Sequence, residues 1–181
     1  AVTGLVHQDI ERMYAQIYAQ KQSLQEIIET AVKRNSKILY IEIADTKGNT
    51  IATTRAADIS RDQERRIAIL EEVLAKKDIV FEQKSKGTYY ELEYHVPIFD
   101  NKKNIISVVE IEIKTPSSSR QDVDEAKRLL DITAMSVEQS VRSVNLMIKD
   151  GEQYVRSIVN DVSQFGKIDK TAEFGFFHDV V

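Results

Sequence analysis

The sequence contains no cysteine, and only 2 prolines and 6 glycines occur among its 181 residues. Without cysteine the chain can form no disulfide, no thiolate metal site and no cysteine nucleophile. Because proline and glycine interrupt regular structure, their scarcity favours long, continuous helices and strands. The length fits one domain with long helical arms, or one domain with an appendage.

The sequence also lacks a long apolar run and a basic patch. No segment approaches the ~20 apolar residues of a membrane-spanning helix, and no signal-peptide core is visible. The formal net charge is -4, and 30% of the residues are charged. Nucleic-acid backbones are bound by basic surfaces, so we expect no nucleic-acid partner. The chain opens inside a helical pattern at residues 1–4, and we interpret it as a fragment excised from a longer protein.

Motifs for catalysis are absent as well. The sequence has no glycine-rich phosphate loop, no Ser-His-Asp arrangement and no zinc-ligand spacing. The serines at 117–119 lack the flanking glycines of a nucleophile elbow, so we interpret them as a linker and helix N-cap. We therefore predict a non-enzymatic domain without a cofactor or metal ion.

Two segments carry the apolar spacing of long helices. Apolar residues recur at alternating steps of four and three from Val6 to Asn35 and again from Arg120 to Phe165, with Gly151 inside the second seam. The second helix would be about 65–70 Å long, far beyond the ~13 Å radius of gyration of a 100-residue domain. It must bury its seam against the first helix, a copy of itself in a dimer, or both. The predicted seam residues are Val6, Ile10, Met13, Ile17, Leu24, Ile27, Ala31, Leu130, Ala134, Val137, Val141, Val144, Ile148, Val155, Ile158, Val162 and Phe165.

Between these helices the pattern predicts five strands and one shorter helix. Residues 38–54 read as a hairpin, because two β-rich runs flank a turn at 46–49. Three further strands are expected at 79–84, 89–99 and 105–114. The shorter helix runs from Ser60 to Lys77, with Ser60 and Gln63 as a capping box. We expect Ile67, Leu70, Val73 and Leu74 to face the core, and Arg61, Arg65, Glu71 and Lys76 to face water.

Side chains along a strand alternate between two faces, which divides the predicted sheet into an apolar and a polar side. The apolar side comprises Leu39, Ile41, Ile43, Leu92, Tyr94, Val96, Ile98, Ile105, Val109, Ile111 and Ile113. The polar side comprises Tyr40, Glu42, Tyr89, Glu91, Glu93, His95, Glu110 and Glu112. We expect a helix to cover the apolar side.

The polar side has two interpretations. Antiparallel sheets commonly leave one face in water, which would make it a solvated surface. Alternatively it is a ligand pocket partly closed by residues 55–77, where clustered carboxylates and one histidine would bind a cation, an amine or a metal ion. His95 is then either a buried, hydrogen-bonded residue or a ligand contact, and Arg55 could bind a carboxylate ligand bidentately. The candidate ligand-binding residues are Tyr40, Glu42, Arg55, Tyr89, Glu91 and His95.

The segments Tyr40–Asn49, Tyr94–Asp100 and Asn104–Ile111, in this order between long helices, resemble the Cache group of PAS-like sensor domains of bacterial receptors. The resemblance implies an α+β fold, a PAS-like antiparallel five-stranded sheet flanked by long N- and C-terminal helices. It divides the chain into a helix (1–36), a sensor core (37–115) and a heptad helix with a tail (116–181). Three features depart from the family. Ser107 replaces its usual glycine, a plain amphipathic helix stands between the second and third strands in place of a ligand-capping loop, and the long final helix suggests exchange between subunits of a dimer.

The resemblance implies an extracytoplasmic sensor domain of a transmembrane histidine kinase or chemoreceptor, on the periplasmic or extracellular side of the membrane. Such a domain would form a homodimer through its helices and bind a small-molecule ligand. The alternative is a non-enzymatic dimerisation or protein-interaction module built on a PAS-like platform. The tail at 166–181 is apolar enough to dock, at a place that the sequence does not indicate.

Overall fold

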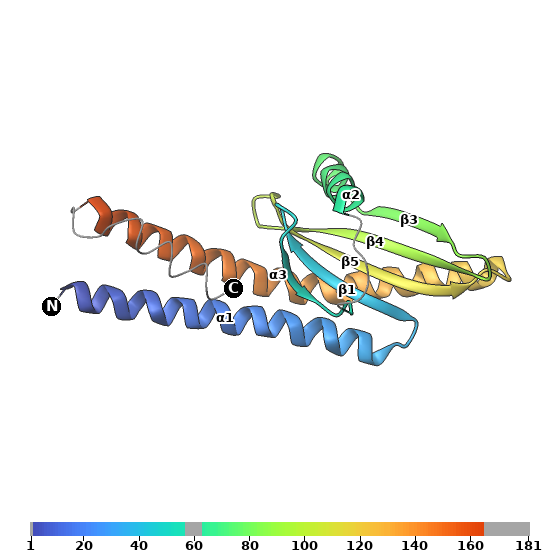
Figure 1. Cartoon of the computed structure of the whole chain (residues 1–181), viewed down its shortest axis with the longest axis horizontal. Helices are drawn as coiled ribbons and strands as arrows, with labels where there is room; N and C mark the ends of the chain where they lie inside the picture. The colour runs from blue at the N-terminus through green and yellow to red at the C-terminus, as the bar shows by residue number, and fades with distance from the viewer. Residues whose placement is uncertain (1, 57–62, 165–181) are drawn as a thin grey trace. The chain divides into compact units, whose positions relative to one another are not determined.

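The computed structural model describes residues 2–56 and 63–164 (Figure 1). Every predicted helix and strand is present in the predicted order. The elements are α1 (Val2–Arg34), β1 (Ile38–Asp45), β2 (Thr50–Thr53), α2 (Gln63–Lys76), β3 (Val80–Ser85), β4 (Tyr89–Phe99), β5 (Ile105–Pro116) and α3 (Arg120–Gln164). The predicted cap at Ser60, the solvent-facing Arg61 and the docking tail lie outside the described residues. Within the described ranges, no helix has the length and apolarity to cross a membrane.

The five strands form one antiparallel sheet in the order β2-β1-β5-β4-β3. β1 and β5 are neighbours in the middle of the sheet although they lie at opposite ends of the strand sequence. The remaining neighbours, β1–β2, β3–β4 and β4–β5, are consecutive hairpins. With helices before and after the sheet, this is the PAS-like α+β fold that the sequence predicts.

The chain forms two compact units. The smaller unit contains residues 1–19 and 147–181, so its described part is the start of α1 and the end of α3. Ile10, Ile17 and Val155 are buried in it, as the heptad pattern predicts. A Cβ on Gly151 would lie 3.1 Å from Cγ1 of Ile17. The glycine in the seam therefore lets the two helices approach closely.

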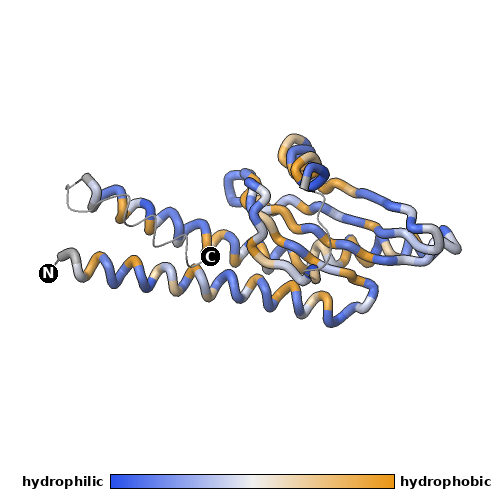
Figure 2. Tube along the Cα trace, viewed as in Figure 1, coloured by the Kyte–Doolittle hydropathy of each residue, from blue (hydrophilic) through white to orange (hydrophobic). Residues whose placement is uncertain are grey.

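The larger unit, residues 20–146, contains the sheet with α2 and α3 on opposite sides. α3 covers the apolar face, where Leu130 is fully buried. The hydroxyl of Tyr94 on β4 donates to Oδ1 of Asp131 on α3 at 2.8 Å. Figure 2 shows the alternation of apolar and polar residues along the strands that directs one face toward this helix. Here α3 covers the sheet of its own chain, and its exchange between subunits stays a prediction.

Ser107 is the residue at which the resemblance to Cache domains implies a glycine. It is fully buried on β5, and its hydroxyl accepts a hydrogen bond of 2.6 Å from Nδ2 of Asn145 on α3. A serine is tolerated under the helix because the buried asparagine above it satisfies the hydroxyl.

The predicted apolar face is wrong at Leu39 and Ile105. A β-bulge between Ile38 and Tyr40 buries Ile38 and leaves Leu39 41% exposed. A second irregularity, beside Phe99 where β4 pairs with β5, moves Ile105 to the other face, against the cluster that includes Val108. A bulge adds one residue to a strand and reverses the alternation beyond it, which a strict period of two cannot anticipate.

α2 lies over the polar face in a different rotation from the predicted one. Val73 is fully buried and Ile69 is 8% exposed, whereas Ile67 is 55% exposed. The prediction that Ile67 faces the core was therefore wrong, and Ile69 takes its place. Since Ile69 and Val73 are i and i+4, the stripe is still helical but turned. This turn brings Arg65 toward the sheet, which corrects the prediction that it faces water.

The α1 seam also shifts by one residue in the larger unit. Leu24 and Ile28 are fully buried, whereas the predicted Ile27 is only partly buried. The side-chain amide of Gln25 makes two hydrogen bonds with the backbone of Thr53. Its Nε2 donates to the Thr53 carbonyl at 2.9 Å, and its Oε1 accepts from the Thr53 amide at 3.1 Å. These bonds attach the C-terminal part of α1 to β2.

Two hairpins of the sheet share one turn design. Asp45 accepts the amides of Lys47 (2.8 Å) and Asn49 (2.9 Å) through Oδ1. Asp100 does the same for Lys102 (2.8 Å) and Asn104 (2.9 Å). The fourth residue of each turn has a positive φ, 85° at Gly48 and 63° at Lys103. The shared Asp-x-Lys-x-Asn spacing thus closes both hairpins in the same way.

Candidate ligand site beneath α2

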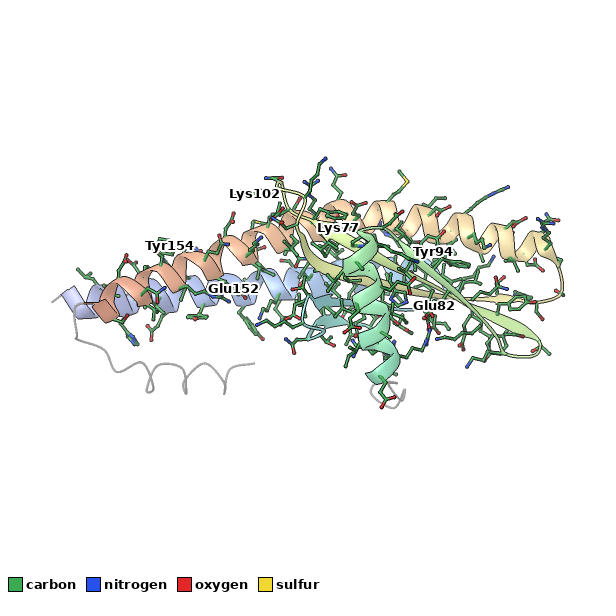
Figure 3. All side chains as sticks on the ribbon, turned by 90° about the horizontal axis from the view of Figure 1, so that it is seen from above. Lys77, Glu82, Tyr94, Lys102, Glu152 and Tyr154 are labelled. Carbon is green, nitrogen blue, oxygen red and sulfur yellow. The ribbon has the colours of Figure 1, made fainter. Side chains whose placement is uncertain are left out.

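A pocket of about 690 Å³ lies between α2 and the polar face of the sheet. Its lining comes from α2 and from four strands, β1, β3, β4 and β5, together with the residues that follow β2 and the turn after β1. Figure 3 shows α2 lying across the sheet with side chains crowded beneath it, and labels Glu82 of β3. α2 therefore partly covers the polar face that the alternation predicts.

The strand register aligns charged residues in rows across this face. In the first row Tyr40 is opposite Glu112, Glu112 is opposite Glu93, and Glu93 is opposite Glu82. In the second row Glu42 is opposite Glu110, and Glu110 is opposite His95. Directly opposite residues project from the same face, so each row gathers its side chains on the face beneath α2. All of these residues except Glu82 line the pocket. Residues distant in the sequence thereby form one polar cluster.

Arg55, which follows β2, holds one side of the cluster. Its Nη2 lies 2.9 Å from Oε1 of Glu110 and also donates to the hydroxyl of Tyr40. The guanidinium stacks over the Tyr40 ring at 3.9 Å from the centroid. The Tyr40 hydroxyl is hydrogen-bonded in turn to Glu110 and, at 2.9 Å, to Glu112. Both the Arg55 and Tyr40 side chains are buried, so this group is rigidly packed.

α2 contributes two arginines that connect it to the floor. Arg65 donates to Glu82 of β3 and, at 2.8 Å, to Glu93 of β4. Arg66 donates to Glu42 of β1, which is 1% exposed. Besides these ion pairs, α2 is held by the apolar cluster around Val73. Ion pairs to three carboxylates and the apolar cluster therefore both connect α2 to the sheet.

Burial and crowding shift the acid–base properties of the floor. Burial, and then the neighbouring Glu93 carboxylate, raise the pKa of Glu112 to about 8. Burial also acts to raise the pKa of Glu93, but the neighbouring His95, Glu112 and Lys84 side chains outweigh it and hold that pKa well below its usual range. Two carboxyl groups this close cannot both ionise easily, so Glu112 retains the proton.

His95 and Tyr40 are shifted in the same environment. Burial lowers the pKa of His95, but the carboxylates of Glu82, Glu93 and Glu110 overcome it and raise that pKa to about 9. Burial, followed by Glu110 and Glu112, raises the pKa of Tyr40 far above its usual value. Such shifts gather at functional sites more often than at structural ones.

Five of the six predicted site residues line the pocket: Tyr40, Glu42, Arg55, Glu91 and His95. Tyr89, the first residue of β4, does not; its ring lies under Nζ of Lys114, 3.9 Å from the centroid. Contact of any of the six with a ligand stays a prediction.

Sequence reasoning missed the cations Arg65, Arg66 and Lys84. The alternation of β3 carries a signal for Lys84, which is opposite Glu91 and therefore on the polar face. The orientation of the two arginines depends on how α2 docks, which the sequence does not reveal.

No protein-family model matches the chain, and no curated protein matches it either. The chain is similar to solved structures at low identity. The gliding protein MglB from Thermus thermophilus has a TM-score of 0.49 at 8% identity, over 70% of this chain and 91% of that chain. Myxococcus xanthus MglB has a TM-score of 0.43 at 11% identity, over 68% and 91%. The LOV protein of Rhodobacter sphaeroides has a TM-score of 0.42 at 8% identity, over 81% and 98%. These values describe general likeness of fold and carry no functional assignment.

Proposed function

We propose that this chain is the sensor domain of a bacterial signalling protein, and that a small polar ligand binds in the pocket beneath α2. The observation that carries the proposal is the buried charged floor of that pocket. Buried ion pairs contribute little net stability compared with apolar packing of the same volume. A pocket of about 690 Å³ that retains so many of them is better explained by recognition of a ligand than by folding.

The response to a ligand would act through α2. The carboxylates of Glu42, Glu82 and Glu93 hold Arg65 and Arg66, so a cationic group that enters the pocket competes with the arginines. A ligand with a carboxylate would compete for Arg55 in the same way. Either exchange alters the bonds that position α2 over the sheet, and the helix then has two arrangements that ligand binding can bias.

The other face of the sheet connects to the long helix. Tyr94 of β4 bonds Asp131 of α3, and Ser107 of β5 bonds Asn145 of α3. β4 and β5 also carry Glu93, His95 and Glu110 on the pocket side, so these two strands contact both the pocket and α3. A small change in their position would be passed to α3, and helices of this kind have discrete packing states.

The proposal includes the setting implied by the resemblance to Cache domains. The domain would be non-enzymatic, extracytoplasmic, and part of a membrane-anchored histidine kinase or chemoreceptor. The support is the PAS-like fold with long helices before and after the sheet, which is the arrangement that such a receptor needs to transmit a signal.

A thermal-shift screen tests the ligand. Small amines, amino acids and carboxylates are added to the purified chain, and at least one class is expected to raise the melting temperature because it binds the folded state only. Glu110→Gln should abolish the shift. Asp124→Asn removes a carboxylate from an exposed position on α3 and should preserve it. A screen without any shift, or a shift that Glu110→Gln leaves intact, would contradict the proposed site.

A dimerisation or protein-interaction module is the second candidate, and a groove between α1 and α3 favours it. The groove has a volume of about 580 Å³ and includes Ile27 of α1 and Ile132 of α3. Ile132 is 65% exposed, and Met135 on the same helix is 74% exposed. Large apolar side chains on a helix surface are typical of a contact with another chain.

Sedimentation equilibrium distinguishes a self-associating domain from a monomer. We expect a homodimer that Ile132→Glu converts to monomers, because a charge would be buried without a partner. Gln139→Glu, at an exposed polar position of α3, should leave the dimer intact. A wild-type chain that stays monomeric at high concentration would contradict both self-association and signal relay through paired helices.

A further inference from the structure

Three potential metal ligands lie close together where the first row of charges ends on β3. Glu82 and Glu93 are opposite each other on β3 and β4, and His95 is the next residue of β4 on the same face. One donor atom from each of the three side chains lies within 4.8 Å of the other two. Two adjacent strands hold the three side chains, so the arrangement does not depend on a loop.

The imidazole of His95 is unsatisfied at this point. Its side chain is only 8% exposed, and its Nε2 has no hydrogen-bond partner. The two nearest carboxylate oxygens are Oε2 of Glu93 at 3.5 Å and Oε2 of Glu82 at 3.7 Å. A buried polar atom without a partner is rare in folded proteins and needs an explanation.

The distances that are too long for hydrogen bonds suit a shared metal ion. A zinc ion binds histidine nitrogen and carboxylate oxygen at about 2.0–2.2 Å, so two ligands at a tetrahedral angle lie about 3.3–3.5 Å apart. The distance of 3.5 Å from His95 Nε2 to Glu93 Oε2 lies in that range. The distance of 3.7 Å from His95 Nε2 to Glu82 Oε2 exceeds the range by a few tenths of an ångström. Glu82 is 30% exposed and near the end of the row, which leaves it free to adjust.

We propose that Glu82, Glu93 and His95 form a binding site for a divalent transition-metal ion such as Zn²⁺, which displaces Arg65 from the two carboxylates. Arg65 donates to Oε2 of both glutamates, the same oxygens that face His95. The guanidinium and the metal ion would therefore occupy one place. Lys84 bonds the other oxygen of Glu93 and can stay, which fixes the orientation of that carboxylate. Three protein ligands leave the fourth position of the ion to water.

This site deepens the proposed function, on which its regulatory meaning rests, by naming a class of ligand for the pocket. Arg65 is one of the two arginines that attach α2 to the sheet. Exchange of Arg65 for a metal ion would remove that attachment and leave Arg66 on Glu42. The metal ion and Arg65 thus compete for the same two carboxylate oxygens, so that metal binding releases Arg65 from the sheet.

Isothermal titration of Zn²⁺ into the chelator-treated full chain tests the site directly. We expect one Zn²⁺ per chain, and at least about tenfold weaker binding after His95→Gln or Glu82→Gln, since each removes a ligand. Arg65→Gln is expected to strengthen binding several-fold, because it removes the competing cation. His7→Gln is the matched control, since His7 is an exposed histidine on α1 next to Glu11.

The variants separate this site from surface binding. Circular dichroism confirms that each variant is folded before titration. The inference is overturned if Zn²⁺ does not bind, if His95→Gln and Glu82→Gln leave the affinity unchanged, if only His7→Gln weakens it, or if Arg65→Gln weakens it. Failure to bind Zn²⁺ would leave the sensor proposal intact, because the thermal-shift screen tests that with small polar compounds in the presence of a chelator.

Discussion

Glu93 of β4 and Glu112 of β5 are directly opposite each other, and both are buried on the pocket floor at 2% and 7% exposure. Burial and the Glu93 carboxylate raise the pKa of Glu112 from 4.5 to about 8. A carboxyl group whose pKa is higher in the folded state stabilises the fold when protonated. Its contribution is complete below pH 4.5 and is lost as the pH rises through about 8.

Glu112→Gln should therefore flatten the dependence of stability on pH. Glutamine keeps the shape of the protonated side chain and cannot ionise. The melting temperature of the variant minus that of the wild type should become more positive as the pH rises from 4.5 to about 8, measured with a chelator present. Asp124→Asn provides the control for a lost surface charge. If the melting temperatures of Glu112→Gln and wild type differ by a constant amount across this pH range, Glu112 does not hold the proton.

Leu130 carries the packing of α3 on the apolar face. It is fully buried, so Leu130→Ala should lower the free energy of unfolding by about 2–5 kcal/mol in urea titrations. Gln139 lies on the same helix at an exposed polar position, and Gln139→Ala should change it by less than about 0.5 kcal/mol. Equal effects of the two substitutions would mean that α3 does not cover the sheet as described.

Gly151 tests the close contact of α1 and α3 in the smaller unit. A Cβ at this position would lie 3.1 Å from Cγ1 of Ile17. Gly151→Leu should therefore lower the free energy of unfolding by about 1–3 kcal/mol through overpacking. Hydrogen exchange should show lost protection at residues 5–19 and 147–160. Gly4→Leu, at a site with no neighbour within 4 Å, should instead strengthen its helix, because leucine favours helix more than glycine. Unchanged protection in Gly151→Leu would contradict the contact.

The paired turns predict a stabilising substitution. Lys103 has a φ of 63°, where Gly48 stands in the equivalent turn with a φ of 85°. A non-glycine residue in this conformation costs about 1–2 kcal/mol, partly offset by the greater freedom of glycine in the unfolded chain. Lys103→Gly should raise the free energy of unfolding by up to about 1 kcal/mol, while Lys103→Ala keeps the strained conformation and should not. A Lys103→Gly chain less stable than Lys103→Ala would refute the strain.

The fold was predictable because its signals are local and repeated. The heptad spacing predicts α1 and α3, and the two β-rich runs that flank the turn at 46–49 predict the first hairpin. Leu39 and Ile105 were misplaced because bulges depend on pairing between strands, which no single strand records. The position of Ile28 in place of Ile27 has a similar origin, since it depends on what α1 packs against.

The pocket was predictable only in part. Alternation placed Tyr40, Glu42, Glu91 and His95 on one face, but it could not show that α2 encloses them. Arg65 was assigned to water because an amphipathic helix offers no sign that its charged edge also meets a charged surface. The unsatisfied Nε2 of His95 depends on distances of a few ångströms between two strands, which only the folded chain defines.

The most direct test of the sensor mechanism measures whether α2 depends on its arginines. Because the chain has no cysteine, spin labels can be placed by Ala75→Cys on α2 and Gln139→Cys on α3, both exposed positions. The proposal predicts one narrow distance distribution in this labelled chain, and a shifted or broadened one when Arg65→Gln and Arg66→Gln are added or when Zn²⁺ displaces Arg65. The same narrow distribution under all three conditions would contradict the claim that the ion pairs beneath α2 control its position.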